Sequence, residues 1–192
     1  LTPFSREVSQ YLVNADTSAI DYVFSWLGNT DLLLAIVKLI EDKMNVEEDV
    51  KSVGVQVIML VEDSIRFYSS ILPDLYKYVL EQSRAFATEA LNAHQATLRM
   101  RGRPKIVLAR NYEEAWKLYA TYHNNTLGVI SDVRFPLCEG GAKVSDAGVR
   151  LMREIRRCDE FLPLIMQSSE SDNRMWAGEV GAGFVDKNSK KM

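Results

Sequence analysis

Cysteine is scarce in this 192-residue sequence. The sequence also lacks the features that are typical of secreted, membrane and nucleic-acid-binding proteins. Cys138 and Cys158 are too few for a disulfide framework. No apolar run reaches the ~18 residues of a membrane span, and no basic segment precedes an apolar one as in a secretion signal. The formal net charge of −3 argues against direct nucleic-acid binding. We therefore expect a globular protein of the reducing cytoplasm with no membrane partner.

The sequence instead contains short apolar runs that alternate with segments of helical periodicity. The runs lie at residues 55–61, 106–109, 127–130, 162–166 and 184–185. Because several are continuously apolar, each is expected to be a strand buried on both faces. This pattern predicts an α/β fold, with a doubly wound, five-stranded parallel sheet covered by helices on both faces.

The connection between the first two runs is about twice as long as one crossover helix needs. Apolar residues at helical spacing predict a helix after residue 64 that Pro73 kinks, and residues 83–100 keep a helical composition. Shorter helices are expected at residues 112–122, 147–157 and 173–181. No helical segment follows the last run, so the sheet should lack its own last helix.

The first fifty residues predict a separate, α-rich appendage. We expect a strand at 20–26, a helix at 30–44 and a charged linker at 47–51. The apolar surface of this helix extends well past one stripe, which calls for burial on more than one side. We expect it either in the groove left by the missing last helix or in a homodimer. Since the sequence begins at Leu1 in mid-pattern, we interpret it as a piece of a longer protein.

A basic cluster precedes the second run. Its members are Arg99, Arg101, Arg103 and Lys105. Such charges can contact phosphate or nucleic acid, but the acidic net charge favours another interpretation. We expect them to complement the C-terminal end of the preceding helix.

Polar residues directly follow four of the five runs. Glu62 and Asp63 follow the first, Asp132 the third, Ser168 the fourth and Lys187 the fifth. The carboxyl ends of parallel strands meet at one edge of a sheet, where such folds bind ligands. Carboxylate oxygens with open positions suit Mg²⁺. Together with the metal, Lys187 could neutralise a phosphoryl group at Asp132 while Ser168 donates a hydrogen bond to it.

Four segments resemble the signature segments of the response-regulator receiver family. They are VIMLVEDS (57–64), SDVRFP (131–136), LPLIMQSS (162–169) and GFVDKNS (183–189). The resemblance covers about residues 54–189 and implies a flavodoxin-like sheet of strand order 2-1-3-4-5. It implies a receiver domain at 54–192, and residues 1–50 then look like the remnant of a preceding receiver-like domain with a linker.

A narrower resemblance comes from the extended first crossover. Together with VEDSIRFYSSILP, LRMRGRPKI and VISDVRFP, it resembles the receiver-like module upstream of PEP/pyruvate-binding, phosphoenolpyruvate-synthase-like domains in bacterial multidomain proteins. It implies that a C-terminal enzyme domain of the same chain is a partner.

The receiver resemblance implies a role for each carboxylate. Asp132 would be the phospho-acceptor and Asp63 a direct Mg²⁺ ligand. Glu62 would act mainly through metal-bound water, and the backbone carbonyl of Arg134 would complete the protein ligands.

Three further positions carry over from the family. Lys187 corresponds to the phosphate-pairing lysine, Ser168 to the hydroxyl that responds to the phosphoryl group, and Phe184 to the switch aromatic. Ser169 adjoins Ser168, which leaves open which hydroxyl faces the phosphate.

Arg134 and Glu170 occupy places that, in receivers, flank the path of hydrolytic water. We expect an ion pair between them that partly covers the pocket. Such a pair would slow dephosphorylation.

The resemblance implies a signalling domain of a two-component system, not an enzyme in the ordinary sense. A histidine kinase or a phosphotransfer protein would supply the phosphoryl group to Asp132. The alternative is a pseudo-receiver that regulates a C-terminal phosphoenolpyruvate-synthase-like enzyme without being phosphorylated, because fold does not fix function. A small-molecule enzyme is less favoured, since the sequence has no glycine-rich phosphate loop.

Overall fold

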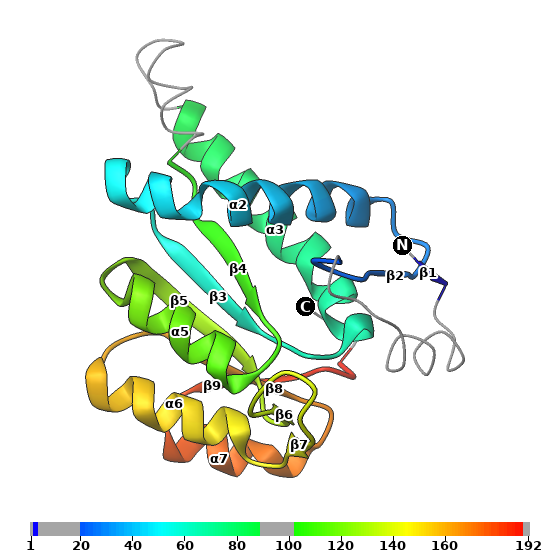
Figure 1. Cartoon of the computed structure of the whole chain (residues 1–192), viewed down its shortest axis with the longest axis vertical. Helices are drawn as coiled ribbons and strands as arrows, with labels where there is room; N and C mark the ends of the chain where they lie inside the picture. The colour runs from blue at the N-terminus through cyan, green and yellow to red at the C-terminus, as the bar shows by residue number, and fades with distance from the viewer. Residues whose placement is uncertain (1, 4–19, 89–101, 190–192) are drawn as a thin grey trace.

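A computed structural model of the chain describes residues 2–3, 20–88 and 102–189. Five parallel strands form its central sheet, in the order β4-β3-β5-β8-β9 (Figure 1). In the sheet's own numbering this is 2-1-3-4-5, so the prediction of a doubly wound, flavodoxin-like α/β fold is confirmed. The strands are β3 (Val57–Val61), β4 (Lys105–Ala109), β5 (Thr126–Asp132), β8 (Leu164–Ser168) and β9 (Gly183–Asp186).

Two apolar layers hold helices to the faces of this sheet. On one face, Leu60 of β3 packs with α3 (Ile65–Thr88) and α2 (Asp31–Val53). On the other face, Met59 packs in a cluster that includes α5 (Tyr112–Tyr122), α6 (Ala147–Cys158) and α7 (Arg174–Glu179). Strands covered on both sides need apolar side chains at successive positions, which explains the continuous apolar runs.

The first crossover is one long helix in the described chain. α3 continues through Pro73, which is buried, and reaches Thr88. The two helical segments expected on either side of residue 83 are therefore joined, since the helix does not end near that residue. The remainder of the second segment, residues 89–100, lies outside the described residues.

The N-terminal elements differ from the sequence-based expectations. Of the predicted 20–26 strand, the structure forms only β2 (Ser25–Trp26), which pairs in parallel with β1 (Thr2–Pro3). α2 runs nine residues beyond the predicted end at 44, so the expected linker at 47–51 is helical. Glutamate and lysine are good helix formers, and the helix ends at Gly54, which adopts the left-handed conformation that suits glycine (φ 69°).

The structure does not place α2 in the groove that the missing last helix leaves, so that expectation is wrong. α2 packs beside α3 and over β4, where buried Asp42 receives hydrogen bonds from Arg103, Tyr76 and the Ile106 N–H. The groove lies along α3 over β5 and β8, has a volume of about 770 Å³, and contains no α2 residue in its lining. Its apolar lining includes Ile58, Leu75, Tyr78, Leu127, Ile130 and Ile165.

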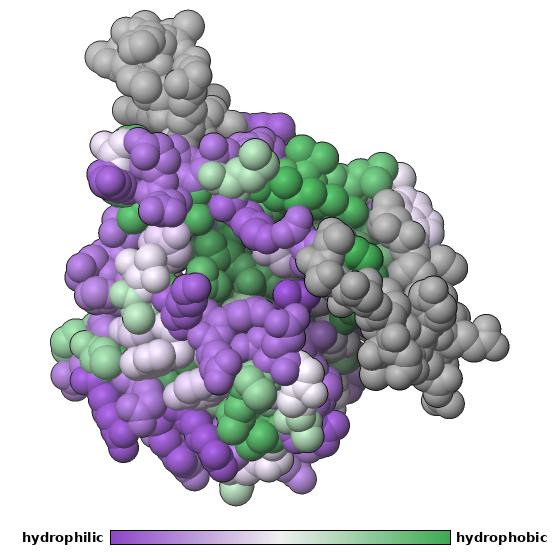
Figure 2. Space-filling view, viewed as in Figure 1, coloured by the Kyte–Doolittle hydropathy of each residue, from purple (hydrophilic) through white to green (hydrophobic). Residues whose placement is uncertain are grey.

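The outer side of α2 remains apolar and exposed, as Figure 2 shows over the N-terminal half of the helix. Its exposed side chains are Leu33, Leu34, Val37, Ile40 and Met44. Burial of this side in a homodimer stays a prediction.

The basic cluster also differs from its expected role. The side chains of Arg103 and Lys105 are 3% and 5% exposed, and they pair with Asp42 and Asp49 of α2. They therefore attach α2 to the sheet and do not complement a helix end. Arg99 and Arg101 lie outside the described residues. Among the described helices, none is long and apolar enough to cross a membrane.

Candidate functional site

Three carboxylates gather where β3 and β5 end. One oxygen atom from each of Glu62, Asp63 and Asp132 lies within 4.8 Å of the others. Asp63 Oδ1 is buried and has no hydrogen-bond partner among the residues that the structure describes. A buried carboxylate oxygen without a partner is costly unless a cation binds it. The arrangement therefore fits a hard divalent cation.

Lys187, from the segment after β9, reaches the same cluster. Its Nζ atom lies 2.5 Å from Glu62 Oε2 and 3.0 Å from Asp132 Oδ2. It also lies 4.4 Å from the centre of the Phe67 ring. The backbone N–H of Lys187 donates to the carbonyl of Ser168, which fixes the start of this segment against β8. Lys187 thus ties the carboxyl ends of β3 and β5 to the last strand.

Burial changes the acidity of two of the carboxyl groups. For Glu62, burial and the adjacent Asp132 carboxylate raise the pKa to about 7, against the opposing effect of Lys187. For Asp63, burial raises the pKa, while the Lys143 ammonium acts in the opposite direction. Both carboxyl groups thus lie in surroundings that oppose a negative charge, which a metal ion would compensate.

Ser168 and Ser169 both line a pocket of about 190 Å³ beside Asp132, but only Ser168 is buried. Ser168 Oγ accepts hydrogen bonds from the Glu170 N–H (3.0 Å) and from Asn173 Nδ2 (2.8 Å). A hydroxyl with two donors on its oxygen keeps its own proton to donate. Asn173 was expected only as the start of a helix, and nothing in its spacing indicated a contact with Ser168.

Phe184 lies outside the lining of this pocket. It is half-buried on β9, and the guanidinium of Arg174 lies 5.1 Å from the centre of its ring.

Arg134 and Glu170 both line the pocket, but the expected ion pair between them is absent from the structure, which describes both residues. Both side chains are exposed. An ion pair between exposed side chains stabilises a protein little, because water solvates both charges. The exposure of Arg134 and Glu170 thus explains why they need not pair.

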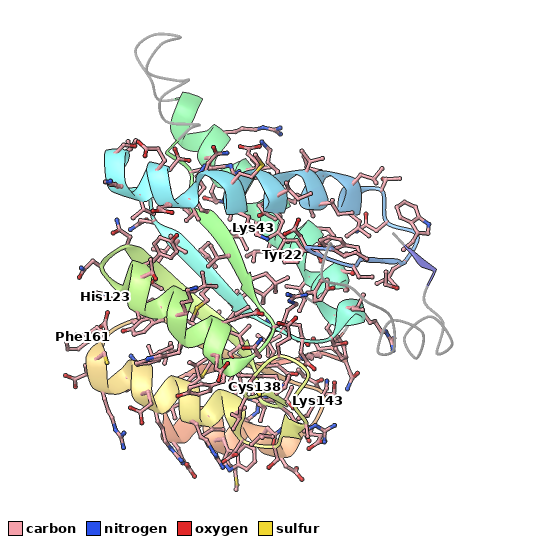
Figure 3. All side chains as sticks on the ribbon, viewed as in Figure 1. Tyr22, Lys43, His123, Cys138, Lys143 and Phe161 are labelled. Atoms are coloured by element: carbon pink, nitrogen blue, oxygen red, sulfur yellow. The ribbon has the colours of Figure 1, made fainter. Side chains whose placement is uncertain are left out.

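A short hairpin that the sequence did not indicate projects onto the site. It pairs β6 (Phe135–Pro136) with β7 (Lys143–Val144) in antiparallel register. Lys143 Nζ lies 2.6 Å from Asp63 Oδ2. Figure 3 labels Lys143 and Cys138 on this loop, beside the N-terminal end of α6.

Gly148, in the first turn of α6, approaches the backbone of β5 very closely. Its N–H donates to the carbonyl of Val133, and a Cβ atom built on Gly148 would lie 2.0 Å from the carbonyl oxygen of Asp132. Only glycine fits at such a distance. The position of Asp132 therefore depends on a residue to which the sequence pattern assigned no role.

No family model matches the sequence, and no curated protein matches it either. Solved structures with a similar fold include the chemotaxis protein CheY4 of Vibrio cholerae (18% identical, TM-score 0.42; 71% of this chain and 89% of that chain covered). A receiver domain protein of Clostridium thermocellum is 20% identical (TM-score 0.45; 71% and 85% covered). The response regulator TrrA of Thermotoga maritima, in complex with Mg²⁺ and BeF, is 19% identical (TM-score 0.39; 71% and 90% covered). These likenesses concern the fold.

Proposed function

We propose that this chain is a phospho-receiver of a two-component signalling system, which accepts a phosphoryl group on Asp132 from a histidine-phosphate donor. The observation that carries the proposal is the joint placement of Asp132, two further carboxylates and the Lys187 ammonium at the carboxyl ends of the strands. The observed doubly wound fold places ligand sites at this same position.

Asp63, Asp132 and Glu62 are the side chains that would hold Mg²⁺, with the backbone carbonyl of Arg134 as a further ligand. Mg²⁺ at this place supplies positive charge to the oxygens of the transferred phosphoryl group. The family resemblance assigns the water-mediated contact to Glu62, and its raised pKa agrees with a weaker direct ligand.

The transfer itself uses a carboxylate oxygen of Asp132 as the nucleophile. That oxygen forms a new P–O bond while the P–N bond to the donor histidine breaks, and the electron pair leaves with the histidine nitrogen. Lys187, 3.0 Å from Asp132 Oδ2, neutralises charge on the phosphoryl oxygens. Ser168 donates its free proton to one of them. Hydrolysis of the acyl phosphate by water restores the carboxylate.

Conformational switching would follow from Ser168 and Phe184. Movement of Ser168 toward the phosphoryl group releases its hydrogen bonds from Glu170 and Asn173, at the start of the segment leading to α7. Phe184 then turns inward from beneath Arg174. Such a rearrangement biases the surface formed by α7 and β9. The chain is a signalling domain in this proposal.

A second function is supported by the groove along α3. A phosphorylation-independent pseudo-receiver would use surface contacts to regulate a C-terminal, phosphoenolpyruvate-synthase-like enzyme domain, and an apolar groove of about 770 Å³ offers such a surface.

Incubation with a small phosphodonor and Mg²⁺, followed by intact-mass measurement, tests the first function. We expect a gain of one phosphoryl group that is lost in Asp132→Asn and kept in the exposed-residue control Asp74→Asn. The gain should disappear when a chelator removes the metal. A folded wild-type protein that gains no mass, or an Asp132→Asn variant that still does, would favour the pseudo-receiver.

A further inference from the structure

The β6–β7 hairpin brings a second ammonium group to the carboxylate cluster. Lys143 Nζ lies 2.6 Å from Asp63 Oδ2, whereas Lys187 contacts Glu62 and Asp132. Each of the three carboxylates that could hold a cation therefore has a lysine beside it. The lysine at Asp63 belongs to β7 of the hairpin and not to the central sheet.

The two oxygens of Asp63 have different surroundings. Oδ2 is held by Lys143, while Oδ1 is buried without a hydrogen-bond partner among the described residues. An ammonium group beside a carboxylate reduces its attraction for a second cation, because the two positive charges repel one another at short distance. Lys143 thus stands where it opposes metal binding at Asp63.

The ion pair can be broken without unfolding the hairpin. The side chain of Lys143 is 48% exposed, so water can solvate its ammonium group as soon as it leaves Asp63. On the opposite strand, Phe135 is fully buried in the core and keeps the base of the hairpin in place. An ion pair with one half-exposed partner is weaker than a fully buried one, and a divalent ion that contacts several carboxylates should displace it.

We propose that the ammonium group of Lys143 competes with the divalent metal for Asp63, so that metal binding releases Lys143 and the tip of the β6–β7 hairpin. This inference rests on the proposed function only insofar as it uses the same metal site. It assigns a role to the β6–β7 hairpin: the hairpin reports whether the metal site is occupied, and it sets the metal concentration at which the receiver becomes competent.

Calorimetric titration with Mg²⁺ alone tests the competition. We expect Lys143→Gln to bind Mg²⁺ about fivefold more tightly than the wild type, since removal of the ammonium relieves the repulsion. Lys143→Arg keeps the charge and should bind as the wild type does. Lys117→Gln, an exposed lysine of α5, controls for the change in net charge.

A reporter on the hairpin tests the release. Cys138 and Cys158 are both exposed, so a Cys158→Ser background leaves one natural labelling position at the hairpin. We expect Mg²⁺ to change the signal of a spin label at Cys138, and the label in Lys143→Gln to show the released signal before metal is added.

Equal or weaker Mg²⁺ binding by Lys143→Gln would overturn the inference and identify Lys143 as a group that only orients Asp63. A hairpin signal that does not respond to Mg²⁺ would overturn it as well. Tighter binding by Lys143→Gln without any phosphorylation of Asp132 would support the inference and contradict the proposed function, so the two can fail separately.

Discussion

Arg103 Nη2 lies 2.7 Å from Asp42 Oδ1 across the boundary between α2 and the sheet, and both side chains are almost completely shielded from solvent. The other oxygen of Asp42 accepts hydrogen bonds from the hydroxyl of Tyr76 and the N–H of Ile106, both at 2.9 Å. Burial and the adjacent Asp42 raise the pKa of Tyr76, so its hydroxyl stays a donor. This carboxylate connects α2, α3 and β4.

Removal of this carboxylate should strongly destabilise the protein. We expect Asp42→Ala to lower the free energy of unfolding by about 3–5 kcal/mol, because the buried Arg103 then keeps only the half-exposed Glu41, 3.4 Å away, as a counter-charge. Urea denaturation measures this difference, and Asp74→Ala on the exposed side of α3 should change it by less than about 0.5 kcal/mol. A loss below about 1 kcal/mol for Asp42→Ala would show that the pair contributes little.

Glu62 should make the stability of the metal-free protein depend on pH. Its pKa rises from 4.5 to about 7 on folding, so the folded state binds the proton more tightly. The stabilising contribution of Glu62 to the free energy of unfolding is fully present below pH 4.5 and is lost as the pH rises to about 7. Because glutamine does not titrate, the free energy of unfolding of Glu62→Gln should rise by up to about 3 kcal/mol relative to the wild type between these limits. Urea denaturation of both proteins in the presence of a chelator, at a series of pH values, measures this difference. A difference that stays constant with pH would contradict the raised pKa of Glu62.

Gly148→Ala should disturb both the fold and the acceptor. The new Cβ would meet the Asp132 carbonyl oxygen at 2.0 Å and the Val133 Cα at 3.0 Å, so backbone must move. We expect a loss of about 1–3 kcal/mol in the free energy of unfolding, as for other overpacked sites, and slower phosphorylation of Asp132.

Gly178 of α7 offers the matched control for this change. Among the described residues, no atom beyond its chain neighbours and the nearby backbone of its own helix lies within 4 Å of a Cβ built there, so Gly178→Ala should stabilise the protein by about 0.5–1 kcal/mol through helix propensity. Thermal melting of both variants checks the contrast. Equal effects at the two glycines would show that α6 can shift away from Asp132 freely.

Arg134 and Glu170 should act independently on the lifetime of the phosphorylated form. Because no ion pair joins them in the structure, alanine substitutions at the two positions should change the logarithm of the decay rate additively. Decay of the acyl phosphate in the two single variants and the double variant measures this. Strong coupling between the two substitutions would mean that the pair forms once Asp132 is phosphorylated.

The sheet was predictable because its strands are buried on both faces. Continuous apolar runs such as 55–61 and 106–109 leave few other interpretations, and the polar residues that follow four of the five runs then fall at one edge of the sheet. Glu62, Asp63, Asp132 and Lys187 come together on that basis. Their assigned roles stay predictions.

Other features depended on tertiary contacts that no local pattern carries. The charged residues 47–51 resembled a linker, although the glycine at 54 marks the actual end of α2. Asp42 and Arg103 look like surface residues in the sequence, since a buried ion pair is visible only when both partners are placed. Lys143 reaches Asp63 through a hairpin whose pairing depends on Phe135 entering the core.

The bond from the Ile106 N–H to Asp42 also bears on association between copies of the chain. β4 is one of the two edge strands of the sheet, and an uncovered edge strand is a template for unwanted pairing with other molecules. α2 shields that strand and occupies one of its outward-facing amides. A shortened fragment that starts at residue 54 would expose this backbone together with two unpaired basic side chains, and we expect it to aggregate on expression.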